Sequence, residues 1–119
     1  MLEDEIKKIC VSARLARDKT SRLPEQHLCK ETSLAICYSA AEIGMTPCLC
    51  QGKFLDSGGV EREHYWVRIE GVIYDATADQ FDECLDPVYI TAERNDSRYR
   101  EECFVIFNET VIKILKNMK

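Results

Sequence analysis

His64 and Asp75 stand at the two ends of a predicted β-hairpin that would bring an imidazole and a carboxylate together. Residues 65–69 and 72–74 are rich in β-branched and aromatic types, and Glu70-Gly71 between them is typical of a two-residue turn. Because side chains alternate between the faces of a sheet, His64 and Asp75 become diagonal neighbours on one face. The expected cross-strand pairs are Ile69 with Val72, Arg68 with Ile73, Val67 with Tyr74 and Trp66 with Asp75.

Cys29 is the candidate nucleophile for this pair. Apolar and small residues recur at helical spacing over residues 28–44, which predicts a helix that starts beside Cys29 and stops at Gly44. The partial positive charge of a helix N-terminus favours a thiolate there. Cys37 lies two turns later on the same face, where desolvation would keep its thiol neutral. We therefore place the nucleophile at Cys29 and keep Cys37 as the alternative.

The chemistry follows from these residue types. His64 takes the thiol proton of Cys29, and Asp75 fixes the tautomer of the ring. The thiolate then attacks an amide or ester carbonyl and forms a thioester. The backbone N–H of Cys29 is one candidate donor for the oxyanion, and the side-chain amide of Gln26 is a second. Trp66 is a candidate to shield the site from water or to contact substrate.

Several short segments surround the three candidate residues in a recognisable order. They are Cys29-x-x-x-Ser33, Gly44, Gln51-Gly52-Lys53-Phe54, His64-x-Trp66-Val67 and Asp75-x-Thr77-x-x-Gln80-Phe81. Together they resemble the transglutaminase-like branch of the papain-like cysteine enzymes, from about residue 28 to residue 81. The resemblance implies a thiol nucleophile at Cys29, a general base at His64 and an orienting carboxylate at Asp75. Ala76 stands where many relatives have proline, and no family motif follows Phe81.

Size and charge narrow the class of protein. A chain of 119 residues with 45% hydrophobic content can bury one ordinary core, so we expect a single domain over residues 1–119. The net charge of −5 argues against a nucleic-acid partner, because phosphate contacts need a basic face. No apolar run is long enough for a membrane span, and the acidic N-terminus lacks the pattern of a signal peptide. We expect a cytoplasmic protein with a peptide or protein substrate and no cofactor; its oligomeric state stays open.

Seven cysteines without an export signal indicate a reduced chain rather than a disulfide scaffold. The pair in Cys48-Leu49-Cys50 is spaced too closely for a usual structural zinc site, so we expect no metal. A set of His27, Cys29, Cys48 and Cys50 remains the metal-binding alternative. We expect four cysteines to act as small buried hydrophobic residues, namely Cys10, Cys37, Cys84 and Cys103.

The rest of the chain predicts the elements that must position the site. We expect an amphipathic helix over residues 2–18, a strand over 45–54, a flexible connection over 60–63, and short strands over 88–92 and 103–107. A terminal helix should begin at Glu109. The mixed-charge run over residues 94–102 is expected to be solvated. Helices followed by antiparallel strands indicate an α+β domain. The resemblance implies, more narrowly, a papain/transglutaminase-like fold with N-terminal helices and the catalytic helix packed on an antiparallel sheet.

Two function classes remain open. The first is a cysteine-dependent acyl-transfer enzyme acting on amide bonds of peptides or proteins. Water as the second substrate would make it a peptidase, amidase or deamidase, and an amine would make it a transglutaminase; small leader peptidases have a similar layout. The second class is a binding module with the same fold and an inactive triad. An acetyltransferase also uses a Cys-His-Asp triad, but the chain shows no segment for the cofactor.

Overall fold

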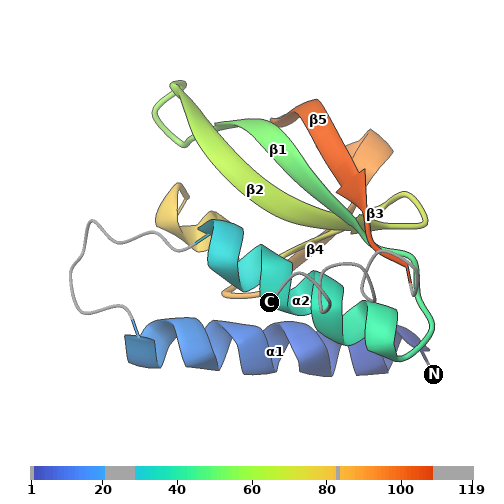
Figure 1. Cartoon of the computed structure of the whole chain (residues 1–119). Helices are drawn as coiled ribbons and strands as arrows, with labels where there is room; N and C mark the ends of the chain where they lie inside the picture. Colours follow the sequence, from blue (N-terminus) through green and yellow to red (C-terminus); the bar gives the residue numbers. More distant parts are fainter. Residues whose placement is uncertain (1, 21–28, 83, 109–119) are drawn as a thin grey trace.

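The chain combines two helices with one antiparallel sheet in a computed structural model that describes residues 2–20, 29–82 and 84–108. Within these ranges the helices are α1 (Leu2–Thr20) and α2 (Cys29–Glu42), and Figure 1 shows them side by side on one side of the sheet. The five strands follow the order β4-β3-β2-β1-β5 across the sheet, and every neighbouring pair is antiparallel. Their bounds are β1 (Cys48–Leu55), β2 (Glu61–Ile69), β3 (Val72–Asp75), β4 (Tyr89–Ala92) and β5 (Tyr99–Ile106). The predicted α+β class is confirmed.

The β2–β3 hairpin has the predicted turn. Glu70 and Gly71 both have positive φ, at 50° and 78°, as a type I′ turn requires. The register therefore fixes which face each later side chain occupies. Three predicted pairs are confirmed, namely Ile69 with Val72, Arg68 with Ile73 and Val67 with Tyr74. The fourth predicted pair, Trp66 with Asp75, is not part of this ladder; on the other edge of β3, Asp75 pairs with Tyr89 of β4.

The two faces of the sheet carry separate hydrophobic clusters. On the helix side, Val67 and Tyr74 pack with residues of α1 and α2 such as Cys10 and Ile36. On the opposite face, Trp66 and its neighbours Cys50 and Ile73 form a second cluster that Tyr99 covers. His64 and Asp75 belong to this second face, because each stands two positions along a strand from a member of the cluster.

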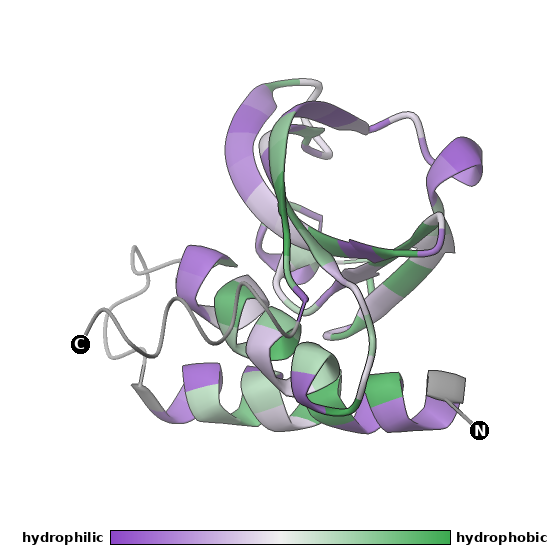
Figure 2. Cartoon of the chain, turned by 45° about the vertical axis from the view of Figure 1, so that its right-hand side comes forward, coloured by the Kyte–Doolittle hydropathy of each residue, from purple (hydrophilic) through white to green (hydrophobic). Residues whose placement is uncertain are grey.

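The sheet curls strongly, and Figure 2 shows the strands bending round above the helices. A polar cluster joins its two edges, since Arg98, just before β5, contacts residues on and beside β4. The guanidinium donates to Asp96 Oδ2 over 2.7 Å and to Asp82 Oδ2 over 3.1 Å. The Tyr89 hydroxyl donates to the same Asp96 oxygen over 2.7 Å. The outer strands β4 and β5 are therefore held together at one end although three strands separate them in sheet order.

Arg14 fastens helix α1 to the segment that follows β3. Its guanidinium donates two hydrogen bonds to Asp79, with N–O distances of 2.6 and 2.8 Å. It also donates to the carbonyl oxygens of Ala76 at 3.1 Å and Pro87 at 3.0 Å. A forked guanidinium can satisfy several acceptors at once, so this one side chain fixes the backbone directly after Asp75.

Some predicted element bounds were wrong. Residues 61–63 are not a flexible connection but the start of β2, where Glu61, Arg62 and Glu63 pair with β1. Their side chains are all exposed, so this end of the strand is held by backbone pairing and shows no apolar pattern. Strand β5 starts at Tyr99, inside the mixed-charge run, rather than at residue 103. The strands predicted at 45–54 and 88–92 begin at Cys48 and Tyr89, helix α1 continues to Thr20, and the predicted terminal helix lies outside the described residues.

All seven cysteines are free thiols. Cys10 and Cys37 are fully buried, as predicted. The same prediction was wrong for Cys84 and Cys103, which are exposed. Cys103 lies on the edge strand β5, and its thiol donates to the side chain of Gln51. No helix in the described ranges is both long and apolar enough to cross a membrane.

Candidate active site

His64 and Asp75 meet as the sequence predicts. The distance from His64 Nε2 to Asp75 Oδ2 is 2.6 Å, and both side chains are completely buried. The I′ turn between β2 and β3 sets the register that puts both residues on one face. An ionised carboxylate can only accept, so Nε2 carries the hydrogen of this bond. The other ring nitrogen, Nδ1, is then free to exchange a proton with a nucleophile.

Asp75 is surrounded by hydrogen-bond donors. Its Oδ1 accepts from the Thr77 backbone N–H at 3.0 Å and from the Thr77 hydroxyl at 3.3 Å. Its Oδ2 accepts from the Tyr99 hydroxyl at 2.8 Å in addition to His64. Burial alone raises the pKa of Asp75, but the charge of His64 and these hydrogen bonds outweigh burial and lower it below the usual value. The carboxylate is therefore ionised at neutral pH.

Aromatic side chains enclose the His64 ring. Phe81 meets it edge-on with ring centroids 4.9 Å apart, Phe54 lies at 5.8 Å and Trp66 at 6.0 Å. These contacts keep water away from the polar pair, which strengthens the electrostatic interaction between them. Trp66 is only 1% exposed, so it packs beside the site and does not form part of the molecular surface.

The thiol of Cys29 lies beside this ring. Nδ1 of His64 is buried and has no hydrogen-bond partner of normal geometry in the described part of the chain. Burial by itself lowers the pKa of His64, but the charge of Asp75, the bond to Asp75 and the interactions with Cys29 outweigh it and raise the pKa to about 9. Cys29 thus influences the ring electrostatically without a well-formed hydrogen bond to Nδ1. Catalytic hydrogen bonds are often long or poorly aligned in the absence of substrate, so the missing bond does not exclude Cys29 as the partner of Nδ1.

The two cysteines of α2 differ sharply in environment. Cys29 begins the described part of α2 and is partly exposed, so a substrate carbonyl can reach it. Cys37 is completely buried. Desolvation and neighbouring thiols raise the pKa of Cys37 to about 12. Among these two thiols, only that of Cys29 acts on His64. The structure therefore brings together Cys29, His64 and Asp75.

The remaining predicted residues fall into two groups. Gln26 and His27 lie outside the described residues, so the second oxyanion donor and the metal alternative based on His27 stay predictions. Within the described residues, no group of three or more His, Cys, Asp or Glu side chains is arranged to hold a metal ion. Cys50, one member of the metal alternative, is buried and directs its thiol to Glu101 at 3.2 Å.

Tyr99 was not among the predicted site residues. This residue lies in the mixed-charge run that we expected to be solvated, yet its hydroxyl reaches the candidate catalytic carboxylate. A lone tyrosine at a strand start gave no signal, because its contact with Asp75 depends on the curl of the whole sheet. The segment Thr77 to Phe81 does hold the residues after Asp75 in place, through Thr77 on the carboxylate and Phe81 on the imidazole.

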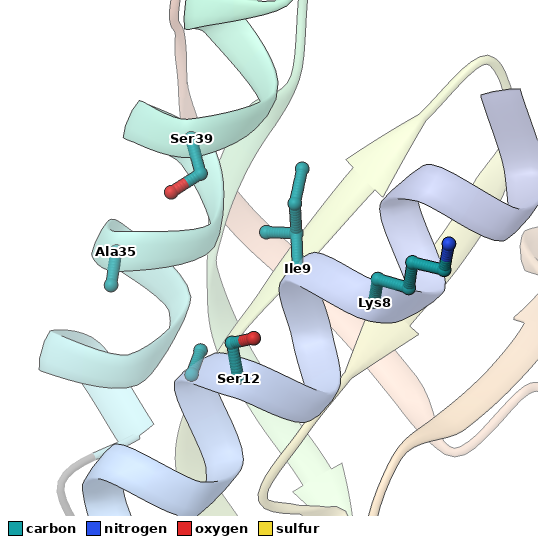
Figure 3. Close-up of a pocket in the computed structure, with 6 residues that line it drawn as sticks. Lys8, Ile9, Ser12, Ala35 and Ser39 are labelled. Atoms are coloured by element: carbon teal, nitrogen blue, oxygen red, sulfur yellow. The ribbon is translucent and has the colours of Figure 1, made fainter.

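A groove between the two helices is separate from this site. It has a volume of about 380 Å³, and Figure 3 shows residues of α1 and α2 that line it. The labelled residues are Lys8, Ile9, Ser12, Ala35 and Ser39. None of the three candidate catalytic residues lines the groove, so it is not the place where substrate would meet Cys29.

Comparisons with protein-family models, with curated proteins and with solved structures give no significant match to this chain. The geometry of the site is therefore the basis for a functional proposal.

Proposed function

We propose that this protein is a cysteine-dependent acyl-transfer enzyme that acts on amide bonds of peptides or proteins. The observation that carries the proposal is the buried bond of 2.6 Å between His64 and Asp75 with the partly exposed thiol of Cys29 beside the ring. A partly exposed thiol next to a carboxylate-oriented imidazole is the arrangement that nucleophilic catalysis by cysteine needs. The position of Cys29 on a helix packed against an antiparallel sheet supports a papain/transglutaminase-like fold.

The first half of the reaction forms a thioester. Transfer of the Cys29 proton to Nδ1 of His64 gives a thiolate–imidazolium pair, which is the charge state of the ring that its raised pKa favours at neutral pH, and the thiolate attacks the carbonyl carbon of the substrate. The tetrahedral intermediate carries its negative charge on oxygen, which the backbone N–H of Cys29 can stabilise at the start of α2. When the intermediate collapses, the C–N bond breaks and His64 donates the proton to the leaving amine. Asp75 stays ionised throughout and keeps the ring in place.

The second half regenerates the thiol. Water or an amine attacks the thioester carbonyl while His64 removes its proton. The bond to sulfur breaks, and the thiolate recovers the proton from His64. Water gives hydrolysis or deamidation, and an amine gives a new amide bond.

Selective alkylation of the seven cysteines tests the proposal. Brief iodoacetamide pulses at several pH values, followed by peptide mass spectrometry, measure the rate at each thiol. At pH 6 we expect Cys29 to react about tenfold or more faster than the exposed thiols of Cys84 and Cys103, because an adjacent imidazole favours the thiolate. Cys37 should not react while the protein is folded, since it is completely buried. His64→Gln should remove the advantage of Cys29.

A different result would identify the alternative. If Cys29 reacts no faster than Cys84 and Cys103 at any pH, the site is not activated and the chain is a binding module. If Cys29 is activated, release of ammonia from glutamine-containing peptides, cleavage of peptide amides and incorporation of a fluorescent amine distinguish the three reactions.

A further inference from the structure

Tyr99 connects the edge strand β5 to the candidate catalytic carboxylate. Its hydroxyl donates to Asp75 Oδ2 over 2.8 Å, although β1 and β2 lie between β5 and β3 in the sheet. The same oxygen accepts from His64 Nε2 over 2.6 Å. Two donors therefore share one oxygen of Asp75. The hydrogen bond from Tyr99 thus acts directly on the oxygen that orients His64.

We propose that Tyr99 is a positioning residue that aligns Asp75 with His64 and moderates the negative charge that the imidazole experiences. This role rests on the function proposed above. A hydroxyl that donates to a carboxylate withdraws charge from the accepting oxygen. Asp75 then holds the imidazolium less tightly than a carboxylate bound to His64 alone.

The tyrosine can act only as a donor in this place. Burial and the charge of Asp75 raise the pKa of the Tyr99 hydroxyl far above its usual value of 10, so the proton stays on oxygen throughout the working range of a protein. Its interaction with Asp75 is thus constant while His64 gains and loses its proton. A donor that keeps its proton lowers the negative charge on Asp75 by a constant amount. A titrating group would change that charge during the reaction.

Packing fixes the position of the ring. Phe54 and Trp66 meet the Tyr99 ring edge-on, with centroids 4.8 and 5.0 Å away. The preceding residue, Arg98, is held by Asp96, Asp82 and Tyr89 in the cluster that joins the two edges of the sheet. Both the side chain and the start of its strand are therefore constrained, so the hydroxyl is held within reach of Asp75.

The moderating effect suits the second task of His64 in the proposed reaction. The imidazolium must release its proton to the leaving amine, and it does so less readily as its pKa rises. Without the hydroxyl of Tyr99, Asp75 would hold the imidazolium more strongly and the proton would be harder to transfer. Tyr99 would thus keep the pair basic enough to activate the thiol and acidic enough to expel the amine.

The test compares Tyr99→Phe with a matched Tyr38→Phe variant. Tyr38 packs against Phe107 in the helix-side cluster, so its variant controls for the loss of a hydroxyl elsewhere. NMR titration of the His64 ring gives its pKa directly, and we expect Tyr99→Phe to raise this pKa by about half a unit or more, because hydrogen bonds to charged groups are strong. Once an amide substrate is identified, kcat should fall several-fold in Tyr99→Phe with little change in KM. Tyr38→Phe should leave both quantities at the wild-type values.

A second measurement covers the case in which Tyr99→Phe does not fold. Replacing all tyrosines by 3-fluorotyrosine makes each phenol a stronger donor, so the pKa of His64 should move down instead of up. A pKa that stays within about 0.2 units in every tractable variant would overturn the role of Tyr99, because a purely structural tyrosine does not produce shifts of opposite sign. The titration needs no enzymatic activity. If Cys29 is not activated but the shifts occur, the proposed function fails and the coupling stands; if Cys29 is activated without the shifts, the reverse holds.

Discussion

Asp75 and Asp96 are two buried carboxylates with similar hydrogen-bond partners and different cations. Each accepts a hydrogen bond from a tyrosine hydroxyl, over 2.8 Å from Tyr99 and over 2.7 Å from Tyr89. For each carboxyl group, burial raises the pKa, but a cation and several donors outweigh burial and lower it. The difference lies in the cation, which is His64 at Asp75 and an arginine at Asp96.

That one difference separates an ion pair with a permanently charged cation from an ion pair whose cation can titrate. The hydrogen bonds to Asp96 raise the pKa of Arg98 further above its already high usual value, so the guanidinium stays charged at every pH at which the protein is folded. The pKa of His64 is raised to about 9, so the charge of this ring changes at mildly alkaline pH. The Asp96 cluster therefore joins the edges of the sheet, whereas the Asp75 cluster has the titratable partner that the proposed proton exchange with Cys29 needs.

The largest contrast should come from neutralising each carboxylate. In Asp75→Asn we expect the alkylation rate of Cys29 at pH 6 to fall about 10- to 100-fold, because a hydrogen bond to a charged group contributes about 1.5–3 kcal/mol. Asp96→Asn should leave this rate within about twofold and lower the thermal midpoint instead, since it weakens only the sheet closure. Per-residue mass spectrometry and circular dichroism measure the two effects. Equal losses of thiol reactivity in both variants would break the distinction between the two carboxylates.

The second largest contrast should be in how the free energy of unfolding depends on pH at the His64–Asp75 pair and at the Asp96–Arg98 pair. The folded pKa of His64 lies above its unfolded value of about 6.5, so its contribution to stability is complete below that pH and is lost as the pH rises toward 9. The two carboxyl groups behave oppositely: their pKa values are lowered, and their contributions are lost only as the pH falls below about 4. Urea unfolding between pH 6 and 9.5 should show a decline in the free energy of unfolding of up to about 3 kcal/mol.

Variants assign this decline to one cluster. Asp96→Asn should keep the decline in the free energy of unfolding at alkaline pH, because the Asp96–Arg98 pair does not titrate between pH 6 and 9.5. Asp75→Asn should flatten it, since the raised pKa of His64 depends chiefly on that carboxylate. An alkaline decline that is unchanged in Asp75→Asn would mean that another group causes it.

The smallest expected effect comes from exchanging the fixed cation. Arg98→Lys keeps the charge but loses the fork that reaches Asp96 and Asp82 together, and the side chain is already 28% exposed. We expect the free energy of unfolding to fall by about 1 kcal/mol, with Cys29 alkylation within about twofold of wild type. Urea denaturation and the alkylation assay measure both quantities. A loss of thiol reactivity larger than the loss of stability would show that the Asp96 cluster also tunes the site.

Local rules were sufficient to predict one part of the site. Glu70-Gly71 fixed the turn, the turn fixed the register, and the register put His64 and Asp75 on one face. The helical spacing around Cys29 likewise distinguished a thiol at a helix start from the one at Cys37. These inferences hold because each depends on a few consecutive residues.

The parts that could not be predicted depend on distant segments. Tyr99 reaches Asp75 only because the sheet curls and because β5 changes register against β1 between Gln51 and Gly52. At Gly52, an added Cβ would lie 2.0 Å from the carbonyl oxygen of Arg100, so the close approach of β5 there requires a glycine. The exposure of Cys84 and Cys103 was not predicted, because residue type alone does not show that Cys84 lies in the connection before β4 or that the Cys103 side chain of the edge strand β5 faces water.

The spread of the site along the chain has a consequence for folding. Cys29 and Tyr99 are 70 positions apart, and His64 and Asp75 lie on two strands between them. Contacts between residues so far apart in sequence form late, because the intervening chain must first be ordered. A partly folded or newly synthesised chain would therefore carry seven ordinary thiols, and the imidazole would act on Cys29 only after the curled sheet has closed around His64. An activated thiol at Cys29 would therefore be a marker of complete folding, and the proposed enzyme would not react with other proteins before it has folded.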